Sequence, residues 1–331
     1  MKRVRVHQFG GPEALQIEEA PDPRPGPGEV LVKAHAIGIN PVETYIRSGS
    51  YTPRPELPYA PGTDASGTVE EIGEGVTDIQ PGDRVYSSGT VTGAYAEKVL
   101  CERFQVHRLP PNVPFAKGAA LGVPYTAAYR ALFQRAGTRP GDVLLIHGAD
   151  GTVGVAAMQL ARARGIRIIA TVGSDEGRDL AAQQGARHIV NHFDADHGDR
   201  ILALTDARGV DVIIEMLASV NLGKDLPLLA PGGRVVIIGS RGTVEINPRD
   251  LMRPETAILG MLVFSASEAD QASIHAAIEA GLENGTLDPL ISRGMALAEA
   301  VEAHRFLETA KPLGKVVLLL RGEGERKGGW Q

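Results

Sequence analysis

The feature that most restricts the fold of this chain is a glycine-containing turn between an apolar run and a helical segment. The run is VLLIHG (143–148), the turn is ADGTVG (149–154), and small and apolar residues follow in VGVAAMQLARARG. A second apolar run, IRIIATVG, comes after that segment. This order is typical of a dinucleotide-binding unit, in which Gly151 lets the backbone approach a pyrophosphate and Gly154 allows close helix–strand packing. A tight strand-to-helix turn that binds no ligand is the alternative.

The surrounding segments define the fold class. Between residues 121 and 265, short apolar runs alternate with helical segments, as in VLLIHGA, RIIATVG, HIVNH, VDVIIEML, RVVIIGS and AILGMLVF. This alternation predicts an α/β unit with a doubly wound parallel sheet covered on both faces. The first 120 residues carry short β-patterned pieces between Pro/Gly clusters and predict a β-rich domain. Residues 266–320 add two amphipathic helices and a closing strand, KVVLLL.

Composition excludes several classes of protein. A chain of 331 residues with a net charge of −6 has room for about two domains and no general attraction to nucleic acid. A single cysteine, Cys101, excludes a disulfide within the chain and fits a cytoplasmic location; we expect it to pack as a small hydrophobe. We expect no signal peptide and no membrane insertion. The charged, glycine-rich tail 321–331 is predicted to be disordered.

The residues after the second apolar run favour NADPH over NADH. An NAD site places Asp or Glu there, whereas this chain has Gly173 and Ser174, with Arg178 shortly after, which leaves room for a 2′-phosphate. Asp175 and Glu176 follow directly and would repel a phosphate if they pointed inward. We expect them to face solvent at a helix N-terminus.

An aspartate, Asp150, stands in the turn where the phosphate charge would arrive. Backbone amides rather than side chains grip phosphates in such turns, so we expect Asp150 to turn outward or to cap the following helix. Its charge should nevertheless weaken the binding of a dianion. His188 and His192 in HIVNH are spaced like metal ligands, but no third ligand is evident, so we expect no metal there.

Long stretches of the chain resemble the zeta-crystallin family of NADPH:quinone oxidoreductases within the medium-chain dehydrogenase/reductase superfamily. They are GINPVETYIRSGSY (38–51), PGTDASGTVE (61–70), PGDRV (81–85), GVPYTAAYRAL (122–132), IIEMLASVNLGKDLPLL (213–229) and GGRVVIIGSRGTVEINPRD (232–250). The resemblance implies a GroES-like catalytic domain (1–120 and 266–320), a Rossmann NADPH-binding domain (121–265), and an active site in the cleft. The chain departs from the family pattern at Asp150 and Thr152, where the family has serine and a second glycine.

The resemblance also implies which residues touch NADPH. In the catalytic domain this is Tyr45. The other predicted contacts lie in the Rossmann domain. With the residues of the glycine turn and of the segment after the second apolar run included, they are Asp150, Gly151, Thr152, Val153, Gly154, Gly173, Ser174, Arg178, His192, Asn221, Ile238, Gly239, Ser240, Arg241, Met261, Leu262 and Val263.

Zinc-dependent relatives supply a cysteine and a histidine early in the chain, and many add a structural lobe with four cysteines. Neither AIGINPVETY nor PGTDASG contains cysteine or histidine, so we expect no zinc and no alcohol dehydrogenation through a Lewis acid. A quinone needs less activation, because it is already electron-poor. We predict Asn40, Tyr45 and Tyr51 as the hydrogen-bond donors in its pocket.

The predicted function is therefore NADPH-dependent, zinc-free reduction of a quinone by a homo-oligomer, a dimer or a tetramer. Reduction of an activated C=C bond in an enone or alkenal is the alternative within enzymes. A protein that uses the nucleotide cleft to bind AU-rich RNA is the alternative from another class.

Overall fold

The computed structural model describes residues 1–252 and 254–320, and the chain divides into two compact units. The first contains residues 1–123 and the segment from Pro289, and the second is Pro124–Asp288. Residues 266–288, which the sequence prediction gave to the catalytic domain, fall in the second unit. There the Tyr129 hydroxyl lies 3.1 Å from Ser273 Oγ, and Gln134 Nε2 donates to the Asp270 carbonyl at 3.0 Å. The predicted tail 321–331 lies outside the described residues.

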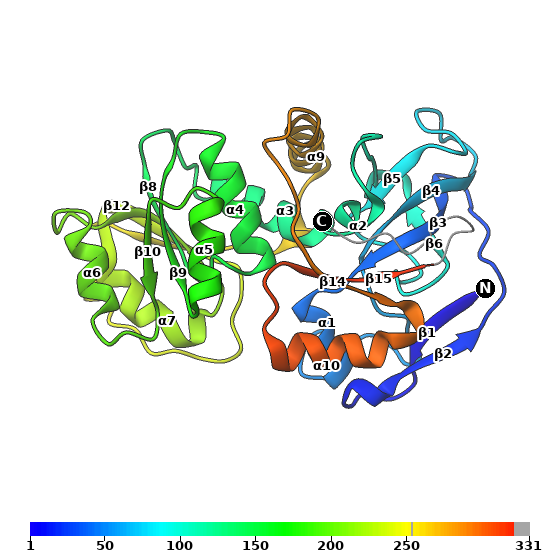
Figure 1. Ribbon diagram of the computed structural model, residues 1–331, viewed down its shortest axis with the longest axis horizontal. Coiled ribbons are helices and arrows are strands. Elements are labelled where there is room, and N and C mark those ends of the chain that lie inside the picture. The colour runs from blue at the N-terminus through cyan, green and yellow to red at the C-terminus, as the bar shows by residue number, and fades with distance from the viewer. Residues whose placement is uncertain (253, 321–331) are drawn as a thin grey trace. The chain divides into compact units, whose positions relative to one another are not determined.

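The second unit is built on a parallel six-stranded sheet in the order β10-β9-β8-β11-β12-β13. Its strands are β8 (Val143–Ile146), β9 (Arg167–Val172), β10 (His188–Asn191), β11 (Val210–Glu215), β12 (Leu229–Ile237) and β13 (Ala257–Gly260). Strand order reverses between β8 and β11. Helices α4 (Thr152–Arg162) and α5 (Asp175–Gln183) therefore cover one face, and α6 (His197–Ala203) and α7 (Ala218–Asp225) cover the other (Figure 1).

Further helical elements complete this part of the chain. They are α3 (Gly122–Tyr129), a π-helical continuation (Arg130–Arg135), α8 (Arg249–Met252) and the long helix α9 (Glu268–Glu283). Helix α9 begins at a capping box, because Ser267 Oγ accepts from the Asp270 amide and the Asp270 carboxylate reaches back to the Ser267 amide.

The first unit contains a seven-stranded sheet with the path β14-β15-β3-β4-β5-β7, in which β6 also pairs with β3. These strands are β3 (Glu29–Gly38), β4 (Asp64–Ile72), β5 (Arg84–Ser87), β6 (Lys98–Glu102), β7 (Val106–Arg108), β14 (Ile291–Ala296) and β15 (Lys315–Leu319). A separate antiparallel pair is formed by β1 (Lys2–Val6) and β2 (Leu15–Glu19). Helices α1 (Pro41–Ser48), α2 (Phe115–Gly118) and α10 (Ala300–Ala310) pack around the sheet.

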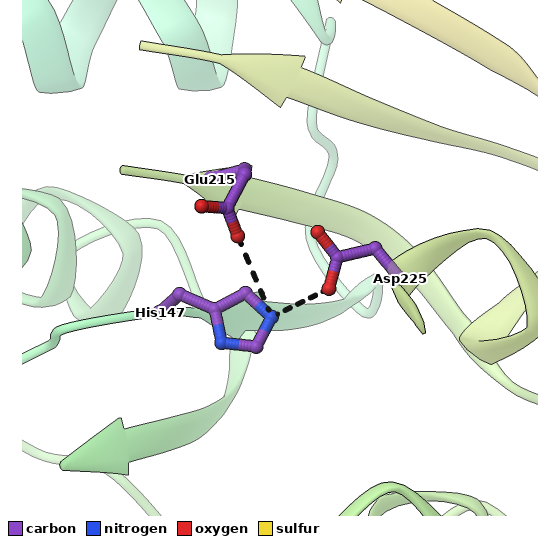
Figure 2. Close-up of side chains that lie close together, drawn as sticks. All are labelled: His147, Glu215 and Asp225. Atoms are coloured by element: carbon purple, nitrogen blue, oxygen red, sulfur yellow. Dashed lines mark hydrogen bonds and ion pairs between the residues drawn. The ribbon is translucent and has the colours of Figure 1, made fainter. Parts of the chain in front are cut away.

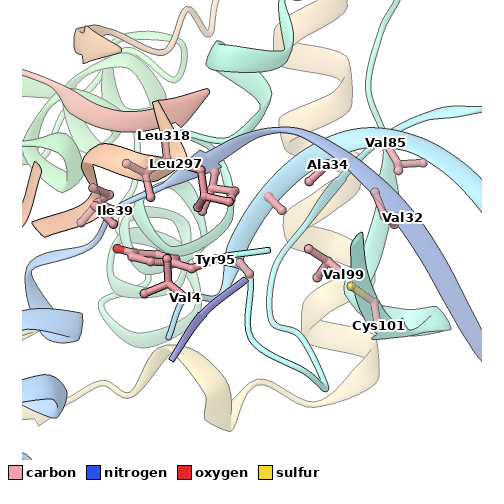
Figure 3. Packing of buried hydrophobic residues seen from close by; sticks show 14 of the residues in the cluster. Val4, Val32, Ala34, Ile39, Val85, Tyr95, Val99, Cys101, Leu297 and Leu318 are labelled. Atoms are coloured by element: carbon pink, nitrogen blue, oxygen red, sulfur yellow. The ribbon is translucent and has the colours of Figure 1, made fainter. Parts of the chain in front are cut away.

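The core of the first unit joins residues from both ends of the chain. Val4, Tyr95, Cys101, Leu297 and Leu318 are all buried in one hydrophobic cluster (Figure 3). Cys101 lies in β6 with no exposed surface, as predicted, and burial raises the pKa of its thiol to about 12. Since the strand closing this sheet comes from the C-terminal segment, the unit needs that segment to complete its core.

The β-patterned pieces and apolar runs of the sequence all contain strands, and the α/β fold class is confirmed. Strands β2, β7 and β14 were not predicted; β2 and β14 have few buried residues, so the sequence lacks a clear apolar alternation there. Over the described residues, no helix combines the length and the apolarity needed to cross a bilayer.

Candidate cofactor and active site

The residues predicted to bind NADPH in the second unit lie at one edge of its parallel sheet. Asp150–Gly154 follow β8, Gly173 follows β9, and His192 follows β10. Residues 238–241 follow β12, and 261–263 follow β13. Because parallel strands end at the same edge, the fold brings these segments together. This carboxyl edge is where open α/β sheets bind their ligands.

The glycine turn has the shape that a phosphate cradle needs. Gly151 precedes α4 in an extended conformation, and a Cβ added there would meet nothing closer than 3.4 Å. A Cβ on Gly154 would lie 2.6 Å from Ala149 Cα and from two carbonyl oxygens, so only glycine fits against the turn. The first turn of α4 includes Thr152 and Val153, whose amides have no partner within the helix. These amides and the open face at Gly151 can hold an anion.

The N-cap of α4 is Gly151 rather than Asp150, and no amide of α4 donates to the Asp150 carboxylate among the residues described. The Asp150 side chain is half-buried and points toward α5, where a Cβ on Gly177 would lie 2.5 Å from its Oδ2. Burial raises the pKa of its carboxyl group, and the charge of His192 lowers it by a smaller amount. The capping alternative was therefore wrong, and the carboxylate is directed toward the helix that follows β9.

Ser174 and Arg178 occupy the start of α5. Ser174 is the N-cap, and its Oγ accepts from the Gly177 amide at 3.0 Å. One guanidinium nitrogen of Arg178 donates to the Ile189 carbonyl at 3.4 Å, and its other nitrogens have no partner among the residues described. Asp175 and Glu176 are exposed, as expected for acids in the first turn of a helix. The Ser174 hydroxyl hydrogen and the Arg178 guanidinium are thus available to a phosphate.

Gly173 lies against His192. A Cβ on Gly173 would be 2.9 Å from His192 Nε2, so the absence of a side chain lets these two predicted contacts meet. The imidazole of His192 also packs edge-on against Phe193, whose side chain is 70% exposed.

Asn221, in α7, is held by Glu215 at the end of β11. Asn221 Nδ2 lies 3.2 Å from each carboxylate oxygen of Glu215, and the Leu217 amide donates to Oε1. The loop 238–241 lies beside this segment, because the Ala218 amide donates to the Gly239 carbonyl at 2.9 Å. The end of β11 and the loop after β12 therefore form one connected group.

Glu215 belongs to a buried cluster with His147 and Asp225 (Figure 2). His147 Nε2 lies 2.9 Å from Asp225 Oδ1 and 3.8 Å from Glu215 Oε2, and Nδ1 lies 3.0 Å from Thr171 Oγ1. Burial would lower the pKa of His147, but the bond to Asp225 and the charge of Glu215 raise it above its ordinary value. Burial raises the pKa of Glu215 to about 7. Their potential ligand atoms lie within 4.8 Å of one another, close enough for a metal ion.

In the first unit, Asn40 meets a buried ion pair. Lys315 Nζ lies 3.0 Å from Asp64 Oδ2 and 2.5 Å from Asn40 Oδ1. Asn40 Nδ2 donates to Asp64 Oδ2 at 2.9 Å and lies 3.3 Å from Glu43 Oε1. Both amide hydrogens of Asn40 thus have acceptors inside the protein, and the residue is buried. This arrangement does not favour Asn40 as the substrate hydrogen-bond donor that the sequence suggested.

A chain of hydrogen bonds continues from Glu43. The Tyr95 hydroxyl lies 2.6 Å from Glu43 Oε2 and 2.9 Å from His304 Nε2, and Arg47 lies 3.3 Å from His304 Nδ1. Burial lowers the pKa of His304 to about 3, so the ring is neutral. Since Arg47 can only donate, the ring proton is on Nε2 and points to Tyr95, whose hydroxyl donates to Glu43. Burial raises the pKa of Glu43 itself to about 7.

Tyr45 and Tyr51, the other predicted donors, flank the end of α1. Tyr45 is inside the helix, and Tyr51 follows the left-handed Gly49 that ends it. Both side chains are half-buried. They differ in this respect from Asn40, which is enclosed.

Comparison with known proteins agrees with this description. Residues 26–111 match the family described as an alcohol dehydrogenase GroES-like domain, and residues 152–279 match the family described as a zinc-binding dehydrogenase. Human quinone oxidoreductase is 46% identical over 322 residues, which cover 97% of this chain and 98% of the human protein. The chain belongs to the quinone oxidoreductase family. The family resemblance predicted from the sequence is confirmed, within the medium-chain dehydrogenase/reductase superfamily.

Two further matches are less similar in sequence to this chain. A 2-haloacrylate reductase from Burkholderia sp. is 30% identical and covers 95% of this chain and 97% of its own length. The solved structure of Escherichia coli quinone oxidoreductase in complex with NADPH is 28% identical in sequence and matches with a TM-score of 0.89. The match covers 97% of this chain and 100% of the E. coli chain.

Sequence reasoning missed two buried charged residues of this quinone oxidoreductase family member, Glu215 and Lys315. Glu215 ends the run VDVIIE directly after three buried apolar residues, and an acid in that position was a usable signal. Lys315 gave none, because its burial depends on distant parts of the chain. A Cβ on Gly38 would lie 2.6 Å from Lys315 Cε, so the lysine passes where Gly38 lacks a side chain.

Proposed function

We propose that this protein is an NADPH:quinone oxidoreductase. The observation that carries the proposal is the 46% identity with human quinone oxidoreductase over nearly the whole of both chains. The carboxyl edge of the parallel sheet supports it, because every strand of that sheet is followed by a segment assigned to the cofactor.

The residues at this edge fit NADPH. The amides of the first turn of α4 would hold the pyrophosphate, with Gly151 leaving room for it. Ser174 and Arg178 would meet the 2′-phosphate that distinguishes NADPH from NADH. When bound, the nicotinamide supplies the hydride, and the protein supplies binding and orientation.

We propose that the reaction proceeds without zinc. The one cysteine of the chain is enclosed in the hydrophobic core, and Asp64 is already paired with the Lys315 ammonium group. A quinone accepts reducing equivalents without a Lewis acid when hydrogen-bond donors lie beside its oxygens. Tyr45 and Tyr51 are the donors that we propose. We assign Asn40 the role of a positioning residue at the start of α1, because its amide group is used internally.

Reduction of an activated C=C bond is the second candidate. It is supported by the full-length similarity to a 2-haloacrylate reductase, whose named substrate carries a conjugated double bond. Homo-oligomerisation as a dimer or a tetramer and a cytoplasmic location are proposals that rest on family membership. Binding of AU-rich RNA has no structural support, and the net charge of −6 disfavours it.

The test is a comparison of steady-state NADPH oxidation with a para-quinone, a cyclic enone and a 2-haloacrylate. We expect the largest kcat/KM with the quinone. A larger value with the enone or haloacrylate would replace the proposal with the second candidate. Tyr45→Phe and Tyr51→Phe should lower kcat/KM for the quinone while the dissociation constant of NADPH changes less, and an unchanged kcat/KM in both variants would remove the tyrosines from the proposed site.

A further inference from the structure

The direction of the Asn221 side-chain amide follows from its contact with Glu215. Asn221 Nδ2 lies 3.2 Å from both Oε1 and Oε2 of Glu215. Both Glu215 oxygens accept from this nitrogen, so the amino end of the amide faces Glu215 and the carbonyl oxygen faces away. Across residues 1–252 and 254–320, that carbonyl oxygen accepts no hydrogen bond.

Glu215 is itself held in place by the buried side chain of His147 and by the Leu217 amide. Its side chain has no exposed surface, and His147 Nε2 faces both Glu215 and Asp225 (Figure 2). The imidazole is fixed on its other side by Thr171 Oγ1 at 3.0 Å. The Leu217 amide donates to Oε1, one of the two Glu215 oxygens that face Asn221. Glu215 therefore has little freedom to move away from Asn221.

We propose that Glu215 is a positioning residue that presents the carbonyl oxygen of Asn221 to NADPH as a hydrogen-bond acceptor. The group it would accept from is a cofactor donor, a ribose hydroxyl or the N–H of the nicotinamide carboxamide. This inference rests on the proposed function, because it takes Asn221 as a cofactor contact. His147 and Asp225 act through Glu215 and touch the cofactor only indirectly.

Metal binding is the competing interpretation of the same cluster. One imidazole and two carboxylates are suitable ligands, and Asp225 Oδ2 is buried without a hydrogen-bond partner in the described part of the chain. The positioning role is favoured because His147 Nε2 and Asp225 Oδ1 are 2.9 Å apart, an ordinary hydrogen-bond distance, and because Glu215 already accepts from Asn221 and from the Leu217 amide.

The test is an exchange of donor and acceptor between the two side chains. In Glu215→Gln, the single remaining oxygen serves the Leu217 amide, so the new amino group faces the amino group of Asn221. Asn221 then turns over and offers a donor to the cofactor. In Asn221→Asp, two carboxylates face each other. We expect each single variant to weaken NADPH binding about tenfold.

The double variant Glu215→Gln/Asn221→Asp restores a donor facing an acceptor and leaves an outward oxygen. We expect its dissociation constant for NADPH to return to within about threefold of the wild-type value. Asp211→Asn is the control, since Asp211 lies on the same strand and accepts from the Val143 amide at 2.8 Å, away from the carboxyl edge. It should lower Tm without changing the dissociation constant.

Fluorescence titration with NADPH and thermal unfolding, measured on each variant, separate the outcomes. Additive losses in the double variant, or losses of Tm with unchanged NADPH binding, would overturn the positioning role. So would stoichiometric metal in the purified protein whose removal abolishes NADPH binding. If the wild-type protein fails to bind NADPH at all, the proposed function fails, which is distinct from failure of the exchange.

Discussion

Replacing Lys315 by methionine should destabilise the protein strongly, because it leaves a buried carboxylate without its counter-charge. Lys315 and Asp64 are 1% and 0% exposed, and Nζ lies 3.0 Å from Asp64 Oδ2. Methionine has a similar length and fills the space beside Gly38, so little of the effect comes from a cavity. Removing one partner of a buried ion pair costs roughly 3–5 kcal/mol. Asp64 keeps bonds from Asn40 and the Val123 amide, which places our expectation near the lower value.

The assay is urea unfolding of the full chain, with Lys98→Met as the matched control. Lys98 is paired with Asp22 and Glu70 at the surface, where such pairs contribute about 1 kcal/mol or less. Asp64→Asn added to Lys315→Met should cost less than the sum of the two single changes, because the double variant buries no unpaired charge. The reasoning is refuted if Lys315→Met is no more harmful than Lys98→Met, or if the two losses simply add.

Four further predictions follow from single residues. Asp150→Ser should lower the dissociation constant of NADPH, since it removes a half-buried charge from the turn; an unchanged or weaker affinity in a titration contradicts this. Gly154→Ala should weaken NADPH binding and cost about 1–3 kcal/mol in unfolding experiments, because the added Cβ would lie 2.6 Å from Ala149 Cα; wild-type stability would show that the turn yields. Cys101 should react with a thiol reagent only after denaturation, as its pKa is about 12 and it is buried; rapid labelling of the native protein would place it elsewhere. The folded state holds a proton on Glu43 up to about pH 7, above the ordinary value of 4.5, so stability falls as pH rises between these values; Glu43→Gln should reduce that fall, and an identical pH profile of the free energy of unfolding would contradict it.

The sequence predicted the second unit well, because its signals are local. Continuous apolar runs, a glycine turn and a small-residue helix each specify their own conformation, and parallel strands then bring their ends to one edge. The positions of Gly154, Ser174 and Asn221 followed from the pattern and from the family resemblance.

The buried polar residues were not predictable in the same way. Asn40, Asp64 and Lys315 come from three distant segments, and only the pairing of β15 with β3 and of β3 with β4 places them together. A single sequence does not state that register. The side-chain direction of Asp150 was also undetermined, because it depends on the packing of the turn against α5 and the absence of a side chain at Gly177.

The most direct test of the central claim is a titration of the purified protein with NADPH and, separately, with NADH. Saturable NADPH binding that is much tighter than NADH binding is the predicted result, and Arg178→Ala should reduce the difference between the two nucleotides. Failure to bind either nucleotide, or equal affinity for both, would contradict the assignment of the carboxyl edge as an NADPH site.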